Sequence, residues 1–279
     1  MHIVCCIKQV PDTTQVKIDP QTNTLIRTGV ESICNPYDLV AVEAAVGLAK
    51  PRGGRVTVVS MGPPQAEAAL RECLALGVDE AILLSDRAFA GADTLATSYA
   101  LYRAIATIAA RETVDLVICG KQAIDGDTAQ TGPGLATRLG CNQFTYVSGV
   151  IELTDDSITV RREVEGGSEV VRGSLPALLT VELELGAPHR ASLPELVRAL
   201  RYEVKVWGAR DISGEAEMLG LKGSPTSVKT IFAPAPRTGG AVYDTRQDGQ
   251  KPLQDFLDAF FTREPVLLRE ILDKGAGHA

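Results

Sequence analysis

Four short apolar runs, each ending in Gly, Asp or Lys, constrain this chain more than any other feature. They are HIVCCIK (2–8), RVTVVSMG (55–62), EAILLSD (80–86) and DLVICGK (115–121). Continuous apolar runs of this length are typical of strands that are buried on both faces of a parallel sheet. The sequence therefore predicts a mainly parallel sheet with helices on both faces.

The segments between these runs have the periodicity of helices. They are PYDLVAVEAAVGLAK (36–50), PPQAEAALRECLALG (63–77) and DTLATSYALYRAIATIAAR (93–111). Helices that cross between parallel strands give a doubly wound, Rossmann-like α/β sheet, whose ligands lie at the carboxyl ends of the strands. This rule places six residues around one crevice: Lys8, Met61, Gly62, Asp86, Gly120 and Lys121.

The character of the sequence changes after residue 140. The stretches QFTYVSGVIEL, SITVRREVEGGSEVVRGS and PALLTVELEL are interpreted as antiparallel hairpins, and so is the stretch 16–29, with its turn at Pro20–Asn23. From about residue 206 the chain is rich in Pro, Gly and Ser, and it continues into LQDFLDAFFTR. We expect an α/β domain over 1–205 and an extended arm over 206–279. The helix of the arm either docks on a partner subunit or folds back on its own domain.

Composition excludes several classes of function. The formal net charge of −7 argues against nucleic acid or an anionic membrane surface as the main partner. Six cysteines form no C-x-x-C pair, which indicates free thiols in a reducing compartment, and three histidines supply metal or Ser-His-Asp chemistry poorly. The start MHIVCCIKQVPD is interpreted as a first strand, and no apolar run reaches the roughly 18 residues of a membrane span. A cytoplasmic location without membrane insertion is expected.

The stretch CGKQAIDGDTAQTGPG (119–134) matches neither the P-loop pattern nor G-x-G-x-x-G. A helix that begins near Asp127 would offer an anion the N–H groups of Thr128 to Thr131 at the positive end of its dipole. Asp127 is the expected N-cap, with Gln130 completing a capping box, and Asp125 is expected to face a sugar hydroxyl or away from a phosphate. A well-capped helix without a ligand fits the same residues.

Three other polar stretches are expected at this edge of the sheet. NPYD (35–38) supplies Asn35 as a cap and Pro36 in the first helical turn. VPDTTQVKID (10–19) follows the first strand, and GADTLATS (91–98) contains Asp93 or Thr94 as the cap of the third helix. Each has an ordinary structural explanation, but together they favour a binding site.

With these motifs in view, the chain resembles the β subunit of electron transfer flavoproteins along almost its whole length. The matching stretches are CIKQVPDT, NPYDLVAVEAA, MGPP, DLVICGKQAIDGDTAQTGP, RASLPELVRA and LGLKGSPTSVK. The resemblance implies an adenine-nucleotide-binding fold in residues 1–205 and, in residues 206–279, an arm that contacts an α subunit in a heterodimer. It implies no catalytic side chain and no metal, because the redox chemistry belongs to the flavin.

The resemblance also implies the site residues. The cofactor-binding residues are Cys6, Asn35, Tyr37, Asp38, Met61, Gly120, Lys121, Gln122, Ala123, Asp125, Gly126, Asp127, Thr128, Ala129, Gln130 and Thr131. Asp12, Thr13, Asp93, Thr94 and Thr97 are expected toward an isoalloxazine or nicotinamide ring. Leu193, within RASLPELVRA, is the expected apolar anchor that docks an acyl-CoA dehydrogenase.

Ordinary members of the family hold AMP in this subunit and pass electrons from acyl-CoA dehydrogenases to a quinone reductase. A subgroup binds FAD there and performs electron bifurcation from NADH, with ferredoxin or flavodoxin as the low-potential acceptor. VPDT, GADTLATS and GDTAQTGP are similar to this subgroup, and Gly126, Thr128 and Ala129 are smaller or less acidic than in ordinary members. FAD is therefore expected, with AMP as the alternative. A free-standing nucleotide binder or hydrolase of the same fold is the third hypothesis.

Overall fold

The computed structural model describes residues 1–12, 17–18, 25–26, 31–227, 241, 243–244, 246 and 250–267. The chain divides into two compact units, Met1–Ala233 and Pro234–Ala279. Each is described here by itself. No helix in the described part of the chain is long and apolar enough to cross a membrane.

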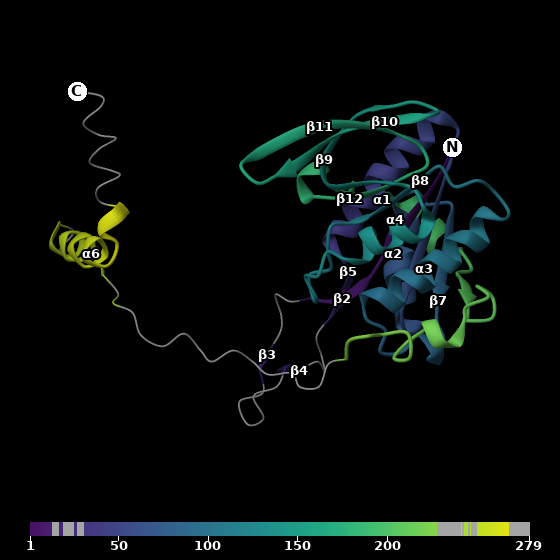
Figure 1. The fold of residues 1–279 in the computed structure, drawn as a ribbon, viewed down its shortest axis with the longest axis horizontal. Coiled ribbons are helices and arrows are strands. Elements are labelled where there is room, and N and C mark those ends of the chain that lie inside the picture. Colours follow the sequence, from purple (N-terminus) through teal and green to yellow (C-terminus); the bar gives the residue numbers. More distant parts are fainter. Residues whose placement is uncertain are drawn as a thin grey trace. The chain divides into compact units, whose positions relative to one another are not determined.

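The first unit is built on a nine-stranded sheet with the order β11-β10-β9-β12-β8-β1-β6-β7-β13 (Figure 1). Seven of these strands are parallel: β1 (His2–Ile7), β6 (Arg55–Met61), β7 (Glu80–Leu84), β8 (Leu116–Gly120), β9 (Asn142–Leu153), β12 (Ala177–Val181) and β13 (Lys205–Trp207). The two antiparallel strands are β10 (Ser157–Val164) and β11 (Gly167–Ser174). The predicted mainly parallel sheet with antiparallel additions is confirmed.

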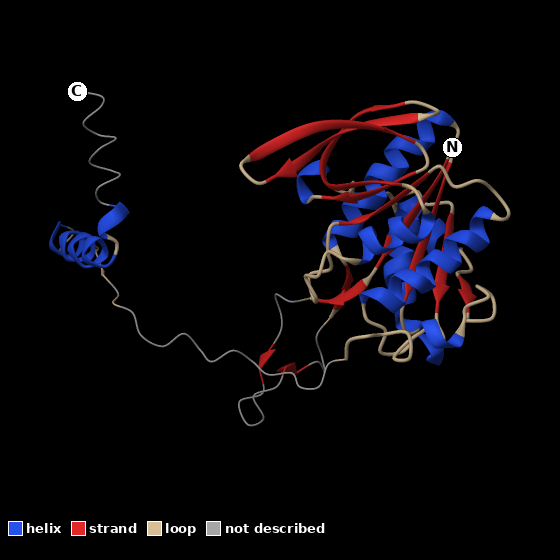
Figure 2. Ribbon diagram, in the orientation of Figure 1, coloured by secondary structure: helices blue, strands red, loops and turns tan. Residues whose placement is uncertain are grey.

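Helices cover both faces of the sheet, as Figure 2 shows. The α-helices of the first unit are α1 (Pro36–Ala49), α2 (Glu67–Ala75), α3 (Thr94–Ala109), α4 (Thr131–Leu139) and α5 (Leu193–Arg201), and the second unit contains α6 (Gln250–Arg263). Short 3-10 helices are η2 (Lys50–Arg52), η3 (Pro64–Ala66), η4 (Arg87–Phe89), η5 (Leu183–Leu185) and η6 (Ala216–Met218). Residues of α1, α2 and α5 pack in one apolar cluster, and those of α3 and α4 pack in the other.

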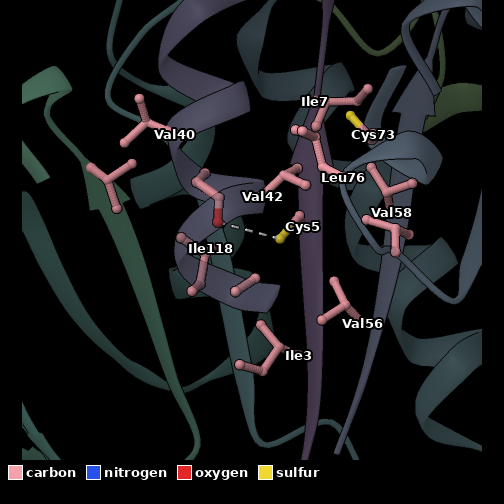
Figure 3. Packing of buried hydrophobic residues seen from close by; sticks show 14 of the residues in the cluster. Ile3, Cys5, Ile7, Val40, Val42, Val56, Val58, Cys73, Leu76 and Ile118 are labelled. Carbon is pink, nitrogen blue, oxygen red and sulfur yellow. Dashed lines mark hydrogen bonds between the residues drawn. The ribbon is translucent and has the colours of Figure 1, made fainter. Parts of the chain in front are cut away.

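Strand β1 shows why the apolar runs are continuous. Ile3, Cys5 and Ile7 point into the cluster with α1 and α2, while Val4 and Cys6 point into the cluster with α3. Figure 3 shows the first of these clusters, where the Cys5 thiol donates a weak hydrogen bond to a carbonyl of α1. All six cysteines are free, as predicted, and five of them are buried.

One of the predicted hairpin strands has a different partner. β12 pairs in parallel with both β8 and β9, so its interpretation as antiparallel is wrong. All five residues of ALLTV are buried, because the strand lies inside the sheet rather than at its edge. The antiparallel interpretation holds for the pairing of β10 with β9 and with β11, and these three strands form a long ribbon in Figure 1.

Smaller strands complete the described fold. β2 (Gln9–Pro11) pairs with β5 (Ser32–Cys34), and β3 (Lys17–Ile18) pairs with β4 (Leu25–Ile26), both antiparallel. The hairpin predicted over 16–29 is therefore present, although its turn at Pro20–Asn23 lies outside the described residues.

The first unit continues well beyond residue 205, where the sequence places the start of the arm. Strand β13 pairs with β7, and Trp207, Ile212 and Leu219 are buried against the α3 face of the sheet. In the second unit, α6 forms where LQDFLDAFFTR was expected to be helical. Phe256 stacks on Phe260 in this helix, with ring centroids 5.7 Å apart.

Candidate functional site

The carboxyl ends of β1 and β8 are joined by one buried carboxylate, that of Asp38 in the first turn of α1. Its Oδ2 accepts the N–H of Lys8 at 2.8 Å, and its Oδ1 accepts the N–H of Gly120 at 3.0 Å. Burial raises the pKa of Asp38 to about 7, although both N–H groups oppose the shift. The chain runs outward from β1 to β6 and β7, then returns to place β8 on the other side of β1. This reversal marks the expected ligand crevice of a doubly wound sheet.

Asn35 ties the start of α1 to the loop after β8. Its side chain is 1% exposed, donates from Nδ2 to the carbonyl of Gln122 at 2.9 Å, and accepts the N–H of Ile124 at 3.2 Å. Asn35 occupies the N-cap position before Pro36, but its side chain makes no capping bond. The predicted capping role is therefore wrong, because the loop takes up both ends of the amide.

The helix after the loop begins later than the sequence predicts. α4 starts at Thr131 with Gln130 at its N-cap, so neither the start near Asp127 nor the capping box is present. Asp127 and Ala129 have φ values of +50° and +52°, which a right-handed helix does not accommodate. The Asp127 carboxylate instead accepts a hydrogen bond from Nε2 of Gln122 at 2.8 Å.

This loop leaves a run of backbone donors open. Within the described part of the chain, no hydrogen bond takes up the N–H groups of Thr128, Ala129, Gln130 and Thr131. The last of them stand at the amino end of α4, where the helix dipole favours negative charge. A residue with positive φ followed by one in the right-handed region, as at Ala129 and Gln130, also turns successive N–H groups to one side. The donor set therefore suits a phosphate group.

Two glycines show where this loop is crowded and where it is open. A Cβ added at Gly132 would lie 2.5 Å from Cγ2 of Thr180 and 3.0 Å from Sγ of Cys119, so α4 can approach β8 and β12 only with glycine there. A Cβ added at Gly126 would meet nothing within 4 Å. The small residue at 126 is thus not required by the packing of the chain itself.

Lys8, which follows β1, and Asp125, in the loop after β8, form an ion pair. Nζ of Lys8 lies 2.7 Å from both carboxylate oxygens of Asp125. Lys8 was expected at the crevice but not among the cofactor-binding residues. Its charge offsets one of the two carboxylates that the loop brings near the open N–H groups.

Lys121 lies in a polar and aromatic setting that the sequence did not reveal. Its Nζ is 2.9 Å from Oε2 of Glu182, and it lies 5.4 Å and 5.7 Å from the ring centroids of Tyr37 and Tyr146. Partial burial disfavours the ammonium, but the hydrogen bond and charge of Glu182 outweigh it and raise the pKa of Lys121. Tyr146 and Glu182 come from β9 and the end of β12, so no local motif could have marked them.

Cys6 and Met61 flank this edge at the ends of β1 and β6. Burial raises the pKa of the Cys6 thiol to about 12, so the thiol is neutral and offers an apolar wall rather than a nucleophile. Met61 is half-buried against the same cluster. In the loop between β8 and α4, the carbonyl of Ala123 accepts the N–H groups of Gly126 and Asp127 and closes a tight turn.

Of the residues predicted at a flavin edge, those that the structure describes lie at the start of α3 and directly after β2. Asp93 caps α3 as expected, accepting the N–H groups of Leu95 and Ala96 at 2.9 and 3.1 Å. The hydroxyl of Thr94 donates to Oε1 of Gln130 at 3.2 Å, which connects the start of α3 to the loop before α4. Thr97 lies in the first turn of α3, its N–H bonded to the carbonyl of Asp93, and the N–H of Asp12 donates to the carbonyl of Glu31. Thr13 lies outside the described residues.

Leu193 is the first residue of α5 and is 74% exposed. With Leu196, Val197 and Leu200 it forms an exposed apolar row along that helix. Hollows of about 670 and 400 Å³ lie beside α5, and neither is lined by residues of the β1–β8 edge. In the described residues, no group of three or more His, Cys, Asp or Glu side chains could hold a metal ion.

Comparison with known proteins places this geometry in context. A family model described as "Electron transfer flavoprotein domain" matches residues 22–211. The chain is 50% identical to "Protein FixA" of Azotobacter vinelandii over 277 residues, which cover 97% of this chain and 98% of that protein. It is also 50% identical to "Electron transfer flavoprotein subunit beta" of Clostridium acetobutylicum over 244 residues, covering 88% and 92%. The corresponding protein of Megasphaera elsdenii is 45% identical over 259 residues, covering 91% and 96%.

Proposed function

The chain belongs to the electron transfer flavoprotein family, as its β subunit, and on this premise we propose that it binds FAD at the edge formed by β1, β8 and α4. The diphosphate would rest on the N–H groups and hydroxyls between Thr128 and Thr131. The adenosine would lie against Cys6, Asn35, Asp38 and Met61. Electron transfer is the function of the family, and the fold supplies placement for a cofactor rather than reactive side chains.

The observation that carries this proposal is the run of open N–H groups from Thr128 to Thr131. Backbone donors at a helix amino end bind phosphate without a basic side chain, which suits an acidic protein. Ala129 and Asp127 hold positive φ angles at a cost of about 1–3 kcal/mol each, and such strain typically persists at ligand-binding sites. The loop is thus shaped for an anion at an energetic cost to the chain.

FAD rather than AMP is supported by the space around Gly126. The chain itself places nothing within 4 Å of a side chain at this position, so glycine leaves room at the loop for a larger ligand. The sequence similarity of GDTAQTGP to the FAD-binding subgroup points the same way. The alternative is an AMP-binding subunit that carries no flavin and supports electron transfer from acyl-CoA dehydrogenases to a quinone reductase.

In the proposed bifurcating complex the residues at the start of α3 would face the redox partners of the site. A bound FAD would supply the chemistry that takes a hydride from NADH and delivers single electrons to the α subunit and to a ferredoxin or flavodoxin. Thr94 and Thr97, together with Asp12, are proposed to border the isoalloxazine or nicotinamide. The carboxylate of Asp93 is already engaged in capping α3.

Two apolar surfaces are proposed to bind proteins. The exposed row on α5 that begins with Leu193 would dock an acyl-CoA dehydrogenase or a similar flavoenzyme, because burying an exposed leucine side chain contributes about 1.5–3 kcal/mol. The α6 helix of the second unit carries Leu253, Phe256 and Leu257, each at least 39% exposed, and would dock on the α subunit.

The amounts of FAD and AMP bound per heterodimer test which cofactor this subunit holds. The chain is co-expressed with its α subunit, the bound ligands are released by heat, and FAD and AMP are quantified per heterodimer. Two FAD, with one bleached by NADH, would support the proposal. One FAD and one AMP would refute it in favour of the alternative.

A charge placed in the loop tests the phosphate contact separately. Ala129→Asp adds a carboxylate among the open N–H groups, and aspartate tolerates the positive φ at this position. The matched control Ala129→Asn has nearly the same shape but no charge. We expect the aspartate variant to lose the nucleotide of this subunit and the asparagine variant to keep it. Equal retention by both variants would show that no phosphate lies at this loop.

A further inference from the structure

We propose that Asp93 is a positioning residue that fastens the segment 220–226, where the chain leaves the α/β unit, to the turn of α3 that borders the open loop. The inference gives Asp93 a different role from the flavin-edge role expected from sequence. Its extension to ligand binding rests on the proposed function. In Figure 1 the segment belongs to the green stretch that follows β13, the partner of β7.

The two oxygens of Asp93 serve two different parts of the chain. Oδ1 accepts the N–H groups of Leu95 and Ala96 at 2.9 and 3.1 Å and so caps α3. Oδ2 accepts the N–H and the hydroxyl of Thr226 at 3.1 and 2.8 Å. The N–H of Asp93 itself donates to Oγ of Ser224 at 2.8 Å. Five hydrogen bonds thus meet at the side chain and the N–H of Asp93, and three of them reach across more than a hundred positions of sequence.

Capping alone does not require this residue to be a carboxylate. Asparagine caps helices about as well as aspartate, because one side-chain oxygen is enough. Only a second acceptor oxygen can take the N–H and hydroxyl of Thr226 while the first caps the helix. Burial of Asp93 opposes its ionisation, but the hydrogen bonds from Ala96 and Thr226 outweigh it and lower its pKa.

A second aspartate makes the same kind of contact with an earlier part of the stretch that follows β13. Oδ1 of Asp86 accepts the N–H of Ala88 in η4 at 3.0 Å, and Oδ2 accepts the N–H of Ala209 at 3.0 Å. Between these two attachments, Ile212 and Leu219 are buried. The stretch 208–226 is therefore held at several points, and among the described residues the bonds of Asp93 to Thr226 are its last attachment before the second unit begins at Pro234.

The same turn of α3 contacts the loop that offers its N–H groups to an anion. Thr94 follows Asp93 directly, and its hydroxyl donates to the side chain of Gln130 at 3.2 Å. Gln130 is the N-cap of α4 and one of the residues with an open N–H. A ligand that orders this loop would therefore order the first turn of α3 and, through Asp93, the segment that leads to the second unit. By linkage, fixing that segment would also favour the ligand-binding form of the loop.

The attachment is tested by amide hydrogen exchange on the heterodimer without added ligand. Asp93→Asn keeps the helix cap and removes the acceptor of Thr226, so exchange of the Thr226 amide should accelerate about tenfold or more. Exchange of Leu95 and Ala96 should stay unchanged. Asp156→Asn is the matched control, because Asp156 also accepts a threonine hydroxyl, from Thr154 at 2.7 Å, but lies in the β9–β10 turn. Equal exchange of Thr226 in both variants would overturn the proposal.

The coupling to the site is tested by adding FAD or AMP to the same proteins after their own ligand is removed. We expect bound nucleotide to slow exchange of the Thr226 amide in the wild type, and Thr94→Val to abolish that slowing when both proteins are compared at saturating nucleotide. Bound nucleotide without any effect on Thr226 would refute the coupling. If neither nucleotide binds, the proposed function fails, whereas the ligand-free comparison still decides the role of Asp93.

Discussion

Asp38→Asn is the substitution that most directly tests how the carboxyl ends of β1 and β8 are held together. Asp38 is 5% exposed, and each of its oxygens accepts one backbone N–H, from Lys8 and from Gly120. Asparagine has nearly the same shape but presents one acceptor and one donor. One of the two N–H groups would then face an amide nitrogen and lose its partner.

Two opposing energies set the expected result. A buried N–H without an acceptor costs about 1–3 kcal/mol, and this cost is independent of pH. In the wild type, ionised Asp38 lowers the free energy of unfolding, because burial disfavours the charged form and raises its pKa from 3.8 to about 7. At about 1.36 kcal/mol for each tenfold change in proton affinity, that interval corresponds to about 4 kcal/mol.

The sign follows from which state binds the proton more tightly. Between pH 3.8 and about 7 the folded protein retains the Asp38 proton while the unfolded chain has released it. The stability that the neutral carboxyl contributes is therefore complete below pH 3.8 and is lost as the pH rises to about 7. Asparagine does not titrate, so the variant escapes this loss.

Guanidinium unfolding of the wild type and the variant from pH 4 to pH 8 measures the difference. We expect the variant to be less stable by about 1–3 kcal/mol at pH 4 and more stable by a similar amount at pH 8. Asp156→Asn should show little change with pH over this range, because hydrogen bonds from Thr154 and Ser157 lower the pKa of Asp156 below 3.8, so its titration lies at more acidic pH. A difference between wild type and Asp38→Asn that does not change with pH would refute this reasoning.

Three further substitutions test the loop and the docking surface. Asn35→Ala leaves two loop groups without partners, so it should lower the free energy of unfolding by about 2 kcal/mol and reduce the nucleotide retained on purification. Gly132→Ala places a Cβ 2.5 Å from Thr180 and should cost about 1–3 kcal/mol in thermal unfolding, whereas Gly126→Ala, with nothing within 4 Å, should be nearly neutral. Leu193→Ala should leave the melting temperature unchanged and raise KM for an acyl-CoA dehydrogenase in steady-state electron transfer.

Each of these expectations has a contrary outcome. Full nucleotide retention by Asn35→Ala would mean that the hydrogen bonds from Asn35 to the loop after β8 do not support nucleotide binding. Equal melting temperatures for the two glycine variants would show that α4 can move away from the sheet at little cost. An unchanged KM for Leu193→Ala would remove α5 from the docking surface.

Much of the fold could be read from single stretches of sequence. The runs 2–8, 55–62, 80–86 and 115–121 predicted strands buried on both faces, and β1 shows the reason, since alternate residues enter the two apolar clusters. The stretch ALLTV of β12 was misassigned. Its apolar character shows that it is buried, but not which strands it pairs with, and the parallel pairing with β8 and β9 is a long-range contact.

The sequence also predicted some features of the candidate site correctly and others wrongly. Local sequence narrowed the cap of α3 to Asp93 or Thr94, because capping depends on residues two and three positions away, and the structure shows that the cap is Asp93. It misplaced the start of α4, because Asp127 and Ala129 have positive φ angles, and Asp127 is tied to Ala123 and Gln122 instead of capping a helix.

The sequence by itself determined the parallel core of the sheet and its helices, because strand and helix periodicities are local, and the edge at which a ligand is expected follows from that topology. Only the tertiary structure decided how polar side chains are used there. Asn35 holds a loop instead of capping its helix, and Glu182 and Tyr146 surround Lys121 from distant strands. The second oxygen of Asp93 reaches Thr226. A polar side chain has several acceptable partners, and the packed fold selects among them by distance.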